Sequence, residues 1–333
     1  MRLPRRVVRQ LTRGVVRPLL SPRFPLVLRR PLLDVTGRVV PLPRGTRRSR
    51  GTLGGVPTER VATREAAGPH QVLYVHGGGY QTGSPASHRA LAAHLSRAAG
   101  APVHLPVYRL APEHPYPAAV DDVVSAYLAL RDAGHPPQRI AVAGDSAGGG
   151  LVMALVLRLR AAGEELPGSI GLISPWLDLD LTSPLLAVNA GTDAMLDPNW
   201  LPDAVDRYLG VAGPRAAGAE QGQIDKRQID TVLRPLDADL AGLPPVHVIA
   251  GGDEVLLGDS DTLVARIRAA GSRVDYLRAE GLWHAFPVFA GMLREADEAV
   301  AALGAAMRSD CAGGPASGPS GTTTSTSPAG GSP

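Results

Sequence analysis

Short runs of apolar and β-branched residues alternate with stretches of helical periodicity along most of this chain. The short runs have the length of buried strands and cover 72–75, 102–107, 139–143, 168–173, 246–250 and 273–277. The helical stretches between them lie near 86–99, 117–133, 147–162, 257–270 and 289–307. Strands that alternate with helices in this way predict an α/β fold, with a mainly parallel central sheet covered by helices on both faces.

Composition divides the 333 residues into five segments. The alternating pattern occupies 56–180 and 235–308, which we interpret as the two parts of one core. Between them, 181–234 mixes Pro, Asn, Gly and charge without a clear period, as an insert would. Residues 1–55 form a basic arm, and 309–333 are rich in Gly, Ser, Thr and Pro, which predicts a disordered tail. The single cysteine, Cys311, falls in this tail, so no intrachain disulfide is expected.

The net charge of +3 hides an asymmetry between the arm and the rest of the chain. The first 50 residues contain fourteen arginines and one acid, Asp34, so this segment carries +13 and the remainder −10. Apolar residues at helical spacing run between the arginines: Leu3, Val7, Val8, Leu11, Val15, Val16 and Leu19. Such an amphipathic basic helix fits either a cap packed on the protein or a peripheral contact with an anionic membrane.

Neither the arm nor the core carries a targeting or nucleic-acid signal. Arginines interrupt every apolar stretch of the arm, so it is not a secretory signal, and no run is long enough to span a bilayer. We therefore expect a cytoplasmic protein, with peripheral attachment to a membrane as the alternative. The arm contains no motif that reads bases, and we expect no nucleic-acid partner.

The sequence Gly144-Asp145-Ser146-Ala147-Gly148 stands between a predicted strand and a predicted helix. This is the context of a G-x-S-x-G nucleophile elbow, in which a sharp turn presents the serine hydroxyl beyond the end of the strand. Small residues on both sides are needed because the strand and the helix approach closely there. The alternative is a glycine-rich turn with an incidental serine. The strand–turn–helix context favours Ser146 as a nucleophile.

A second glycine-rich segment, His76-Gly77-Gly78-Gly79, directly follows the predicted strand at 72–75. Acyl transfer from an ester passes through a tetrahedral oxyanion, which needs preorganised N–H donors. We expect the amides of Gly77 and Gly78, together with that of Ala147 after the nucleophile, to form this oxyanion hole. A phosphate-binding loop is the weaker alternative, because neither G-x-G-x-x-G nor Gly-Lys-Ser/Thr occurs.

A serine nucleophile also needs a base and an acid that orients the base, which in this fold follow in the order Ser, acid, His. His284 lies in the loop after the strand at 273–277, and Asp253 follows the strand at 246–250. Asp253 is closest to the strand end and is preferred, with Glu254 and Asp259 as rival acids. The spacing of the acids matches no metal-binding loop, and we expect no metal.

Four aromatic residues flank these loops and are candidates for lining a substrate pocket: Tyr80, Trp176, Trp283 and Phe286. Simple packing in the core is an equally good interpretation of aromatics at such positions.

Taken together, these segments resemble the bacterial hormone-sensitive-lipase-like esterases, in the subgroup with the Gly-Asp-Ser-Ala-Gly motif. The resemblance covers roughly 61–307 and includes His76-Gly77-Gly78-Gly79-Tyr80 and Tyr108-Arg109-Leu110-Ala111-Pro112-Glu113. It implies an α/β-hydrolase fold and cofactor-free hydrolysis of carboxylic esters with short or medium acyl chains. It also implies a helical cap built from the arm and from the region after the fifth strand.

The expected activity is therefore that of a serine carboxylesterase or lipase acting on a small-molecule or lipid ester. A deacetylase or a lactone hydrolase would use the same three residues, and the sequence leaves both open. A non-catalytic ligand-binding homologue would be expected to lack one of the three. A homodimer is also compatible with the sequence.

Overall fold

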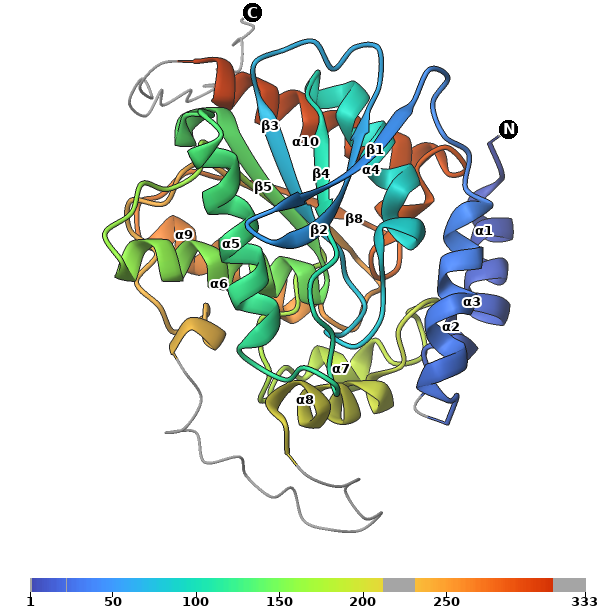
Figure 1. The fold of residues 1–333 in the computed structure, drawn as a ribbon. Coiled ribbons are helices and arrows are strands. Elements are labelled where there is room, and N and C mark those ends of the chain that lie inside the picture. The colour runs from blue at the N-terminus through green and yellow to red at the C-terminus, as the bar shows by residue number, and fades with distance from the viewer. Residues whose placement is uncertain (1, 22, 212–230, 314–333) are drawn as a thin grey trace, which may run out of the picture.

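The computed structural model describes residues 2–21, 23–211 and 231–313, and in this part the predicted α/β architecture is present (Figure 1). Eight strands form one sheet in the order β1-β2-β4-β3-β5-β6-β7-β8. The strands are β1 (Arg47–Leu53), β2 (Val56–Ala62), β3 (Gln71–Val75), β4 (Val103–Pro106), β5 (Ile140–Asp145), β6 (Ser169–Ile173), β7 (Val246–Gly251) and β8 (Val274–Ala279). Strands β3 to β8 pair in parallel, whereas β2 is antiparallel to both β1 and β4.

The hairpin of β1 and β2 was not predicted from the sequence. Its two-residue turn consists of Gly54 and Gly55, both at positive φ (56° and 82°), which suits a tight turn between twisted strands. Strand β1 lies at the edge of the sheet, and almost all of its residues are exposed, so it carries arginines rather than an apolar pattern.

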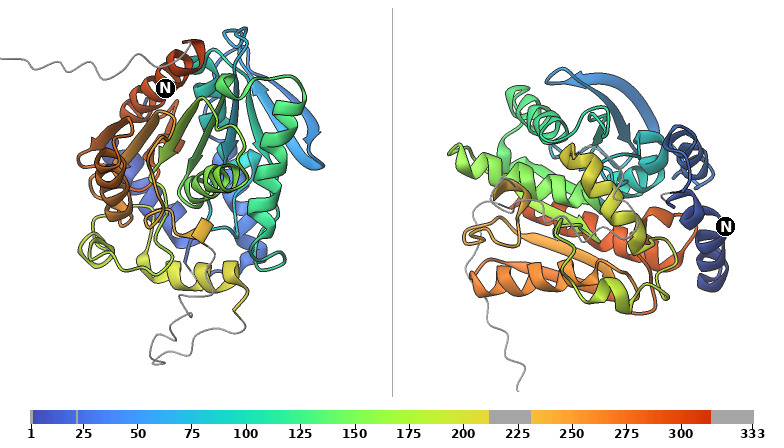
Figure 2. Two further views of the ribbon diagram at one scale, coloured as in Figure 1. Left: turned by 90° about the vertical axis from the view of Figure 1, so that its left-hand side faces the viewer. Right: turned by 90° about the horizontal axis from the view of Figure 1, so that it is seen from below.

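Helices cover both faces of the sheet (Figure 2). Successive side chains of a buried strand point to opposite faces, so each strand contributes to two separate core clusters. On β3, Leu73 and Val75 belong to one buried cluster and Val72 and Tyr74 to the other. Helices α5 (Ala118–Asp132), α6 (Ala147–Ala161) and α9 (Leu257–Ala269) pack on the first face. Helices α4 (Pro85–Ala99) and α10 (Arg294–Ala312) pack together on the second.

Helix α10 extends beyond the boundary predicted for it. Residues 309–312, assigned to the tail from their composition, form its last turn, and Cys311 is buried there. The remainder of the predicted tail, 314–333, lies outside the described residues.

The arm folds into helices that lie beside α4 at one side of the molecule (Figure 1). It comprises α1 (Arg5–Leu11), a π-helical turn η1 (Thr12–Val16), α2 (Arg17–Leu19) and α3 (Leu26–Arg38). The insert contributes α7 (Leu185–Val188), α8 (Leu201–Leu209) and three-residue 3₁₀ turns at Pro198–Trp200 and Thr231–Leu233. Two more 3₁₀ turns, at Pro137–Arg139 and Phe286–Phe289, belong to the core. Among the described helices, none is long and apolar enough to cross a bilayer.

Candidate active site

Ser146 occupies a sharp turn between β5 and α6, with φ 53° and ψ −124°. A positive φ is uncommon for a residue with a side chain and marks local backbone strain. The neighbouring glycine pattern has a steric cause, because a Cβ on Gly148 would collide with the carbonyl oxygen of Val75. Strand β5 thus delivers the serine close to the end of β3, as a nucleophile elbow requires.

Asp145, which precedes the serine, organises the loop after β3. Its buried carboxylate accepts hydrogen bonds from the Tyr74 hydroxyl (2.8 Å) and the Gly77 amide (3.0 Å), and faces the Nε2 of His88 (3.3 Å). Burial raises the pKa of Asp145, but His88 and the hydrogen bonds outweigh burial and hold that pKa below its ordinary value. The pKa of His88 is raised despite burial, chiefly by Asp145, which favours the imidazolium form of His88 beside this carboxylate.

This contact changes the set of amides available to an oxyanion. The Gly77 N–H, predicted as an oxyanion donor, is already donated to Asp145. In the described part of the chain, the amides of Gly78 and Gly79 donate to no other group. The sequence could not show this, because the motif alone does not indicate which of three consecutive N–H groups already has an acceptor within the protein.

His284 follows β8 and lines the same cavity as Ser146. It is 3% exposed, and its Nδ1 lies 3.9 Å from the Oε1 of Glu254, which is fully buried. Among the described residues, neither of these two atoms has a hydrogen-bond partner elsewhere. The other oxygen of Glu254 accepts from the Ser174 hydroxyl (2.6 Å) and the Gly251 amide (2.8 Å), which fixes the carboxylate.

The surrounding carboxylates determine the charge preference of the imidazole. Burial alone lowers the pKa of His284, but Glu254 first, then Asp193 and Asp145, outweigh burial and raise the pKa above its ordinary value. Asp193, from the insert, is also fully buried and accepts from the amides of Val255 (3.0 Å) and His284 (3.4 Å). The insert therefore contacts both the acid loop and the histidine loop directly.

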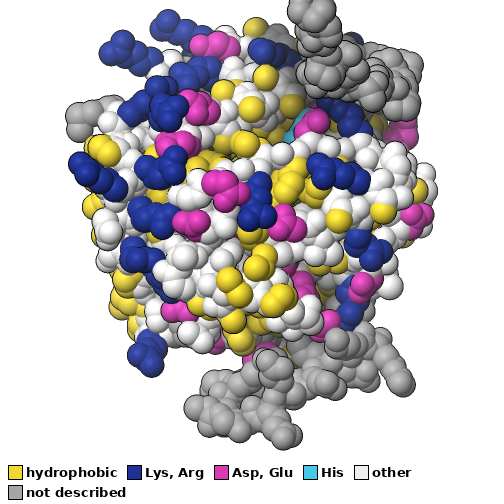
Figure 3. Space-filling model, turned by 180° about the vertical axis from the view of Figure 1, so that it is seen from behind, with side chains coloured by type: hydrophobic (Ala, Val, Ile, Leu, Met, Phe, Trp, Pro, Cys, Tyr) yellow, Lys and Arg dark blue, Asp and Glu magenta, His cyan; other side chains and the backbone are white. Residues whose placement is uncertain are grey.

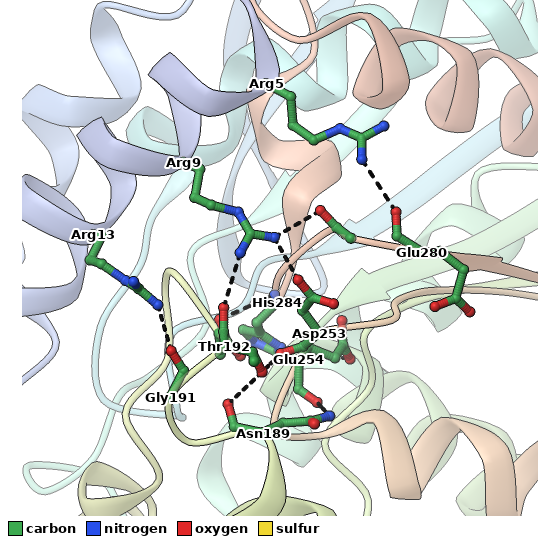
Figure 4. Close-up of polar contacts among 12 residues, drawn as sticks. Arg5, Arg9, Arg13, Asn189, Gly191, Thr192, Asp253, Glu254, Glu280 and His284 are labelled. Atoms are coloured by element: carbon green, nitrogen blue, oxygen red, sulfur yellow. Dashed lines mark hydrogen bonds and ion pairs between the residues drawn. The ribbon is translucent and has the colours of Figure 1, made fainter.

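Asp253 lies in the same loop as Glu254 but is directed away from His284 (Figure 4). Its carboxylate accepts from the Nη2 of Arg9 at 2.6 Å and is about one quarter exposed. This differs from the prediction, which chose the acid nearest the strand end. The structure brings Ser146 and His284 to one cavity, and the carboxylate beside the imidazole is that of Glu254.

Arg9 is one of four arginines, spaced four residues apart, that attach the arm to loops around the site, and Figure 4 shows three of them, Arg5, Arg9 and Arg13. Besides Asp253 it donates to the carbonyl oxygens of Gly281 (2.8 Å) and Thr192 (3.4 Å), and its guanidinium lies over the Trp283 ring. The other three also donate to backbone carbonyl oxygens: Arg5 to Glu280 (3.5 Å), Arg13 to Gly191 (2.6 Å), and Arg17 to Asp193 (2.8 Å) and Ala190 (3.0 Å). The helical period explains this ladder, since residues four apart share one face.

The cavity beside Ser146 and His284 has a volume of about 120 Å³ and a largely apolar lining. Residues of the arm form one wall, and they are Val16, Leu20, Leu33, Thr36, Gly37 and Val40. The insert supplies Met195, Leu196 and Trp200, and the segment after His284 supplies Val288 and Phe289.

None of the four aromatics predicted as pocket candidates lines this cavity. Tyr80 stacks on Tyr208 with ring centroids 3.7 Å apart, and Trp176, Trp283 and Phe286 are buried in the core clusters. Packing is therefore the interpretation that the structure supports for them. Among the described residues, no group of three or more His, Cys, Asp or Glu could hold a metal ion.

Comparison with known proteins places these features in a family. The model of the alpha/beta hydrolase fold matches residues 72–288. LipR of Mycobacterium tuberculosis is 36% identical over 313 residues, covering 92% of this chain and 95% of LipR. An acetyl-hydrolase of Streptomyces hygroscopicus is 37% identical over 257 residues, which cover 77% of this chain and 81% of the acetyl-hydrolase. A solved esterase of the bacterial hormone-sensitive lipase family superposes with a TM-score of 0.82 at 36% identity, covering 93% of this chain and all of the other.

Proposed function

Since this chain belongs to the alpha/beta hydrolase fold family, among the bacterial hormone-sensitive-lipase-like esterases, and is an ester hydrolase, we propose that Ser146, His284 and Glu254 carry its reaction. The observation that carries this assignment is the placement of His284 in one cavity with Ser146 while its Nδ1 faces the buried carboxylate of Glu254. Asp253, the acid predicted from the sequence, is not assigned the role of orienting His284, because its carboxylate is bound to Arg9.

In the proposed cycle, His284 takes the proton of the Ser146 hydroxyl as Ser146 attacks the ester carbonyl. The imidazolium then protonates the leaving alcohol, and the neutral imidazole activates a water that hydrolyses the acyl-enzyme. Glu254 stabilises the imidazolium and keeps the Nδ1 protonated, so that Nε2 is free to accept. Asp193 adds negative charge beside the same ring and joins the insert to both loops.

The oxyanion is proposed to be stabilised by the amides of Gly78 and Ala147. Gly78 lines the cavity with Ser146, and its amide donates to no other group in the described residues, whereas the amide of Gly77 is held by Asp145. Asp145 contributes indirectly: its ion pair with His88 fixes the loop that presents these amides.

The size of the cavity supports an acyl group of short or medium length as the substrate's bound portion. Its apolar lining supports burial of hydrocarbon and disfavours a charged acyl group. Removal of an acetyl group is a second candidate, favoured by the similarity to the Streptomyces acetyl-hydrolase.

Labelling by a serine-directed phosphonate, together with hydrolysis of p-nitrophenyl butyrate, tests the nucleophile. We expect Ser146→Ala to abolish labelling and to lower kcat by several orders of magnitude. The matched control is Ser49→Ala on the exposed edge strand β1, which should label and turn over like the unmodified protein. Labelling of Ser146→Ala at the usual stoichiometry would refute the assignment.

A further inference from the structure

The outer face of the arm is unusually apolar for a surface. Of the thirteen large hydrophobic side chains that are exposed in the described residues, nine lie within residues 7–42. Val27 and Val39 are 76% and 70% exposed. The full set in the arm is Val7, Leu11, Val15, Val27, Leu28, Leu32, Val35, Val39 and Leu42. Concentrated exposure of this kind marks a contact surface rather than the scattered apolar residues of an ordinary exterior.

The spacing of these residues shows that they form stripes along the helices. On α3, Leu28, Leu32, Val35 and Val39 recur at intervals of four, three and four residues, so they share one face. The buried face of the same helix carries Arg29 and Leu33. On α1 and η1, Val7, Leu11 and Val15 repeat every four residues beside the buried Val8. Each helix therefore has an apolar side that the protein itself leaves uncovered.

Exposed arginines lie on or next to the helices that carry these stripes. Arg6, Arg23 and Arg38 are exposed, and in the described part of the chain their side chains form no hydrogen bond or ion pair. Figure 3 shows basic side chains gathered along the side of the molecule where the arm lies. Arg44, Arg47, Arg48 and Arg50 extend the basic region onto the exposed edge strand β1.

We propose that this face of the arm, with Leu28, Leu32 and Val35 at its centre and Arg6, Arg23 and Arg38 around them, binds the surface of an anionic lipid bilayer. The apolar stripes would enter the region between headgroups and acyl chains, and the arginines would pair with lipid phosphates. A second copy of this chain is the less suitable occupant. A symmetric contact through this face would bring the exposed Arg6, Arg23 and Arg38 of two copies against one another without acidic partners.

Docking in this way also serves the active site, and this part of the inference rests on the proposed function. Helix α3 presents its outer face to lipid while Leu33, Thr36 and Gly37 on the same helix line the cavity beside Ser146. The bound protein would hold the cavity next to the bilayer surface, where an ester of low solubility accumulates. Access to such an ester, rather than chemistry at Ser146, is what the membrane contact would change.

Co-sedimentation with vesicles tests the surface without any turnover. We expect binding to vesicles of phosphatidylcholine that contain phosphatidylglycerol, little binding to phosphatidylcholine alone, and weaker binding at higher ionic strength. Arg6→Gln, Arg23→Gln and Arg38→Gln combined should lower the partition coefficient on the order of 100-fold. Leu28→Gln, Leu32→Gln and Val35→Gln combined should also release the protein.

Matched controls remove the same kinds of residue elsewhere. Arg266, Arg268 and Arg308 are exposed outside the arm, as are Val107, Val188 and Leu277. Their triple glutamine variants should bind vesicles like the unmodified protein. The proposal fails if the unmodified protein stays in the supernatant with anionic vesicles at low salt, or if the controls lose as much binding as the arm variants. Arm-dependent dimerisation in sedimentation velocity without vesicle binding would also overturn it, in favour of a second copy.

Two activity measurements keep this result separate from the proposed function. Ser146→Ala should bind vesicles normally while failing to hydrolyse any ester. The two arm variants should hydrolyse soluble p-nitrophenyl acetate at the unmodified rate and lose activity only toward a long-chain ester embedded in anionic vesicles. Equal activity of arm and control variants on the embedded ester would show that the surface does not serve the active site.

Discussion

Replacement of Glu254 by glutamine tests which of two adjacent carboxylates serves the imidazole of His284. The side chain keeps its size, and its carbonyl oxygen can still accept from Ser174 and the Gly251 amide. The amide NH₂ then faces the Nδ1 of His284, where the carboxylate oxygen had been. An NH₂ group favours an unprotonated Nδ1, which moves the ring proton to Nε2 and prevents Nε2 from accepting the serine proton.

The magnitude follows from the distance between the two groups. At 3.9 Å, opposite unit charges attract by about 4 kcal/mol at an effective dielectric constant of about 20. Loss of that attraction in the transition state corresponds to a rate reduction on the order of 1,000-fold. Substitution of the acid by its amide in other serine triads costs about 10,000-fold, because the tautomer is also wrong. We therefore expect Glu254→Gln to lower kcat by roughly 1,000- to 10,000-fold.

Asp253→Asn is the matched control, since it makes the same chemical change one residue away. Its carboxylate is partly exposed and bound to Arg9, and we expect a loss of less than about tenfold. The assay is kcat and kcat/KM for p-nitrophenyl butyrate as a function of pH, with circular dichroism to confirm folding. Because the carboxylates raise the pKa of His284, activity should rise with pH through a value above the ordinary histidine range.

In Glu254→Gln the residual activity should rise at lower pH than in the unmodified protein, because the carboxylate that most favours the imidazolium is gone. A reduction of 1,000-fold or more in Asp253→Asn, with Glu254→Gln close to unmodified, would refute the reasoning and restore Asp253 as the acid.

Three further changes test the surroundings of the site. Arg9→Met removes the hydrogen bonds to Asp253, Gly281 and Thr192, and kcat/KM should fall by about tenfold. Arg9→Lys should restore part of the lost kcat/KM. The control Arg2→Met, on the exposed end of the arm, should leave kcat/KM unchanged. Asp145→Asn breaks the buried pair with His88 and should lower the free energy of unfolding in urea by about 3–5 kcal/mol. The pKa of Asp145 is lowered in the folded protein, so its contribution to the free energy of unfolding should be lost as the pH falls through this lowered pKa. The pKa of His88 is raised, so its contribution to the free energy of unfolding should be lost as the pH rises through this raised pKa. Thr36→Trp fills the cavity beside Ser146 and should lower the ratio of octanoate to acetate ester hydrolysis, whereas an unchanged ratio would place the acyl group elsewhere.

Strands β3 to β7 are buried along their whole length and could be predicted from the sequence, because burial demands continuous apolar residues. The second edge strand, β8, is only partly buried but still carries a short apolar run. All six predicted runs correspond to β3 to β8 within two residues. The edge hairpin of β1 and β2 could not be predicted, because β1 is exposed to solvent and carries arginines where a buried strand would carry apolar residues. The arm stripe was predicted as one amphipathic face, but only Val8 is fully buried, while Val7, Leu11 and Val15 are exposed.

The site shows the same division between pattern and geometry. Ser146 and His284 stand where strand ends require them, so chain order was enough to predict that they share one cavity. The choice between Asp253 and Glu254 depends on side-chain direction, which proximity to a strand end does not encode. One more backbone position and one more methylene let Glu254 fold under the loop, while Asp253 remains at its surface with Arg9. Contacts with the arm and insert, such as those of Arg9 and Asp193, join segments far apart in sequence and leave no local pattern.

The composition of the arm follows from the two surfaces that it connects. Its inward arginines donate mainly to backbone carbonyl oxygens of the loops at 189–193 and 279–281. A carbonyl accepts from any arginine at the right distance, so these contacts help to fix the arm independently of the ion pairs of Arg5 with Glu295, Arg9 with Asp253 and Arg17 with Asp197. Further acidic partners there would add negative charge near His284, which already faces Glu254 and Asp193, and would raise the pKa of the imidazole further. Attachment through carbonyls therefore lets a strongly basic segment cover the site while its remaining arginines stay available to an anionic surface outside.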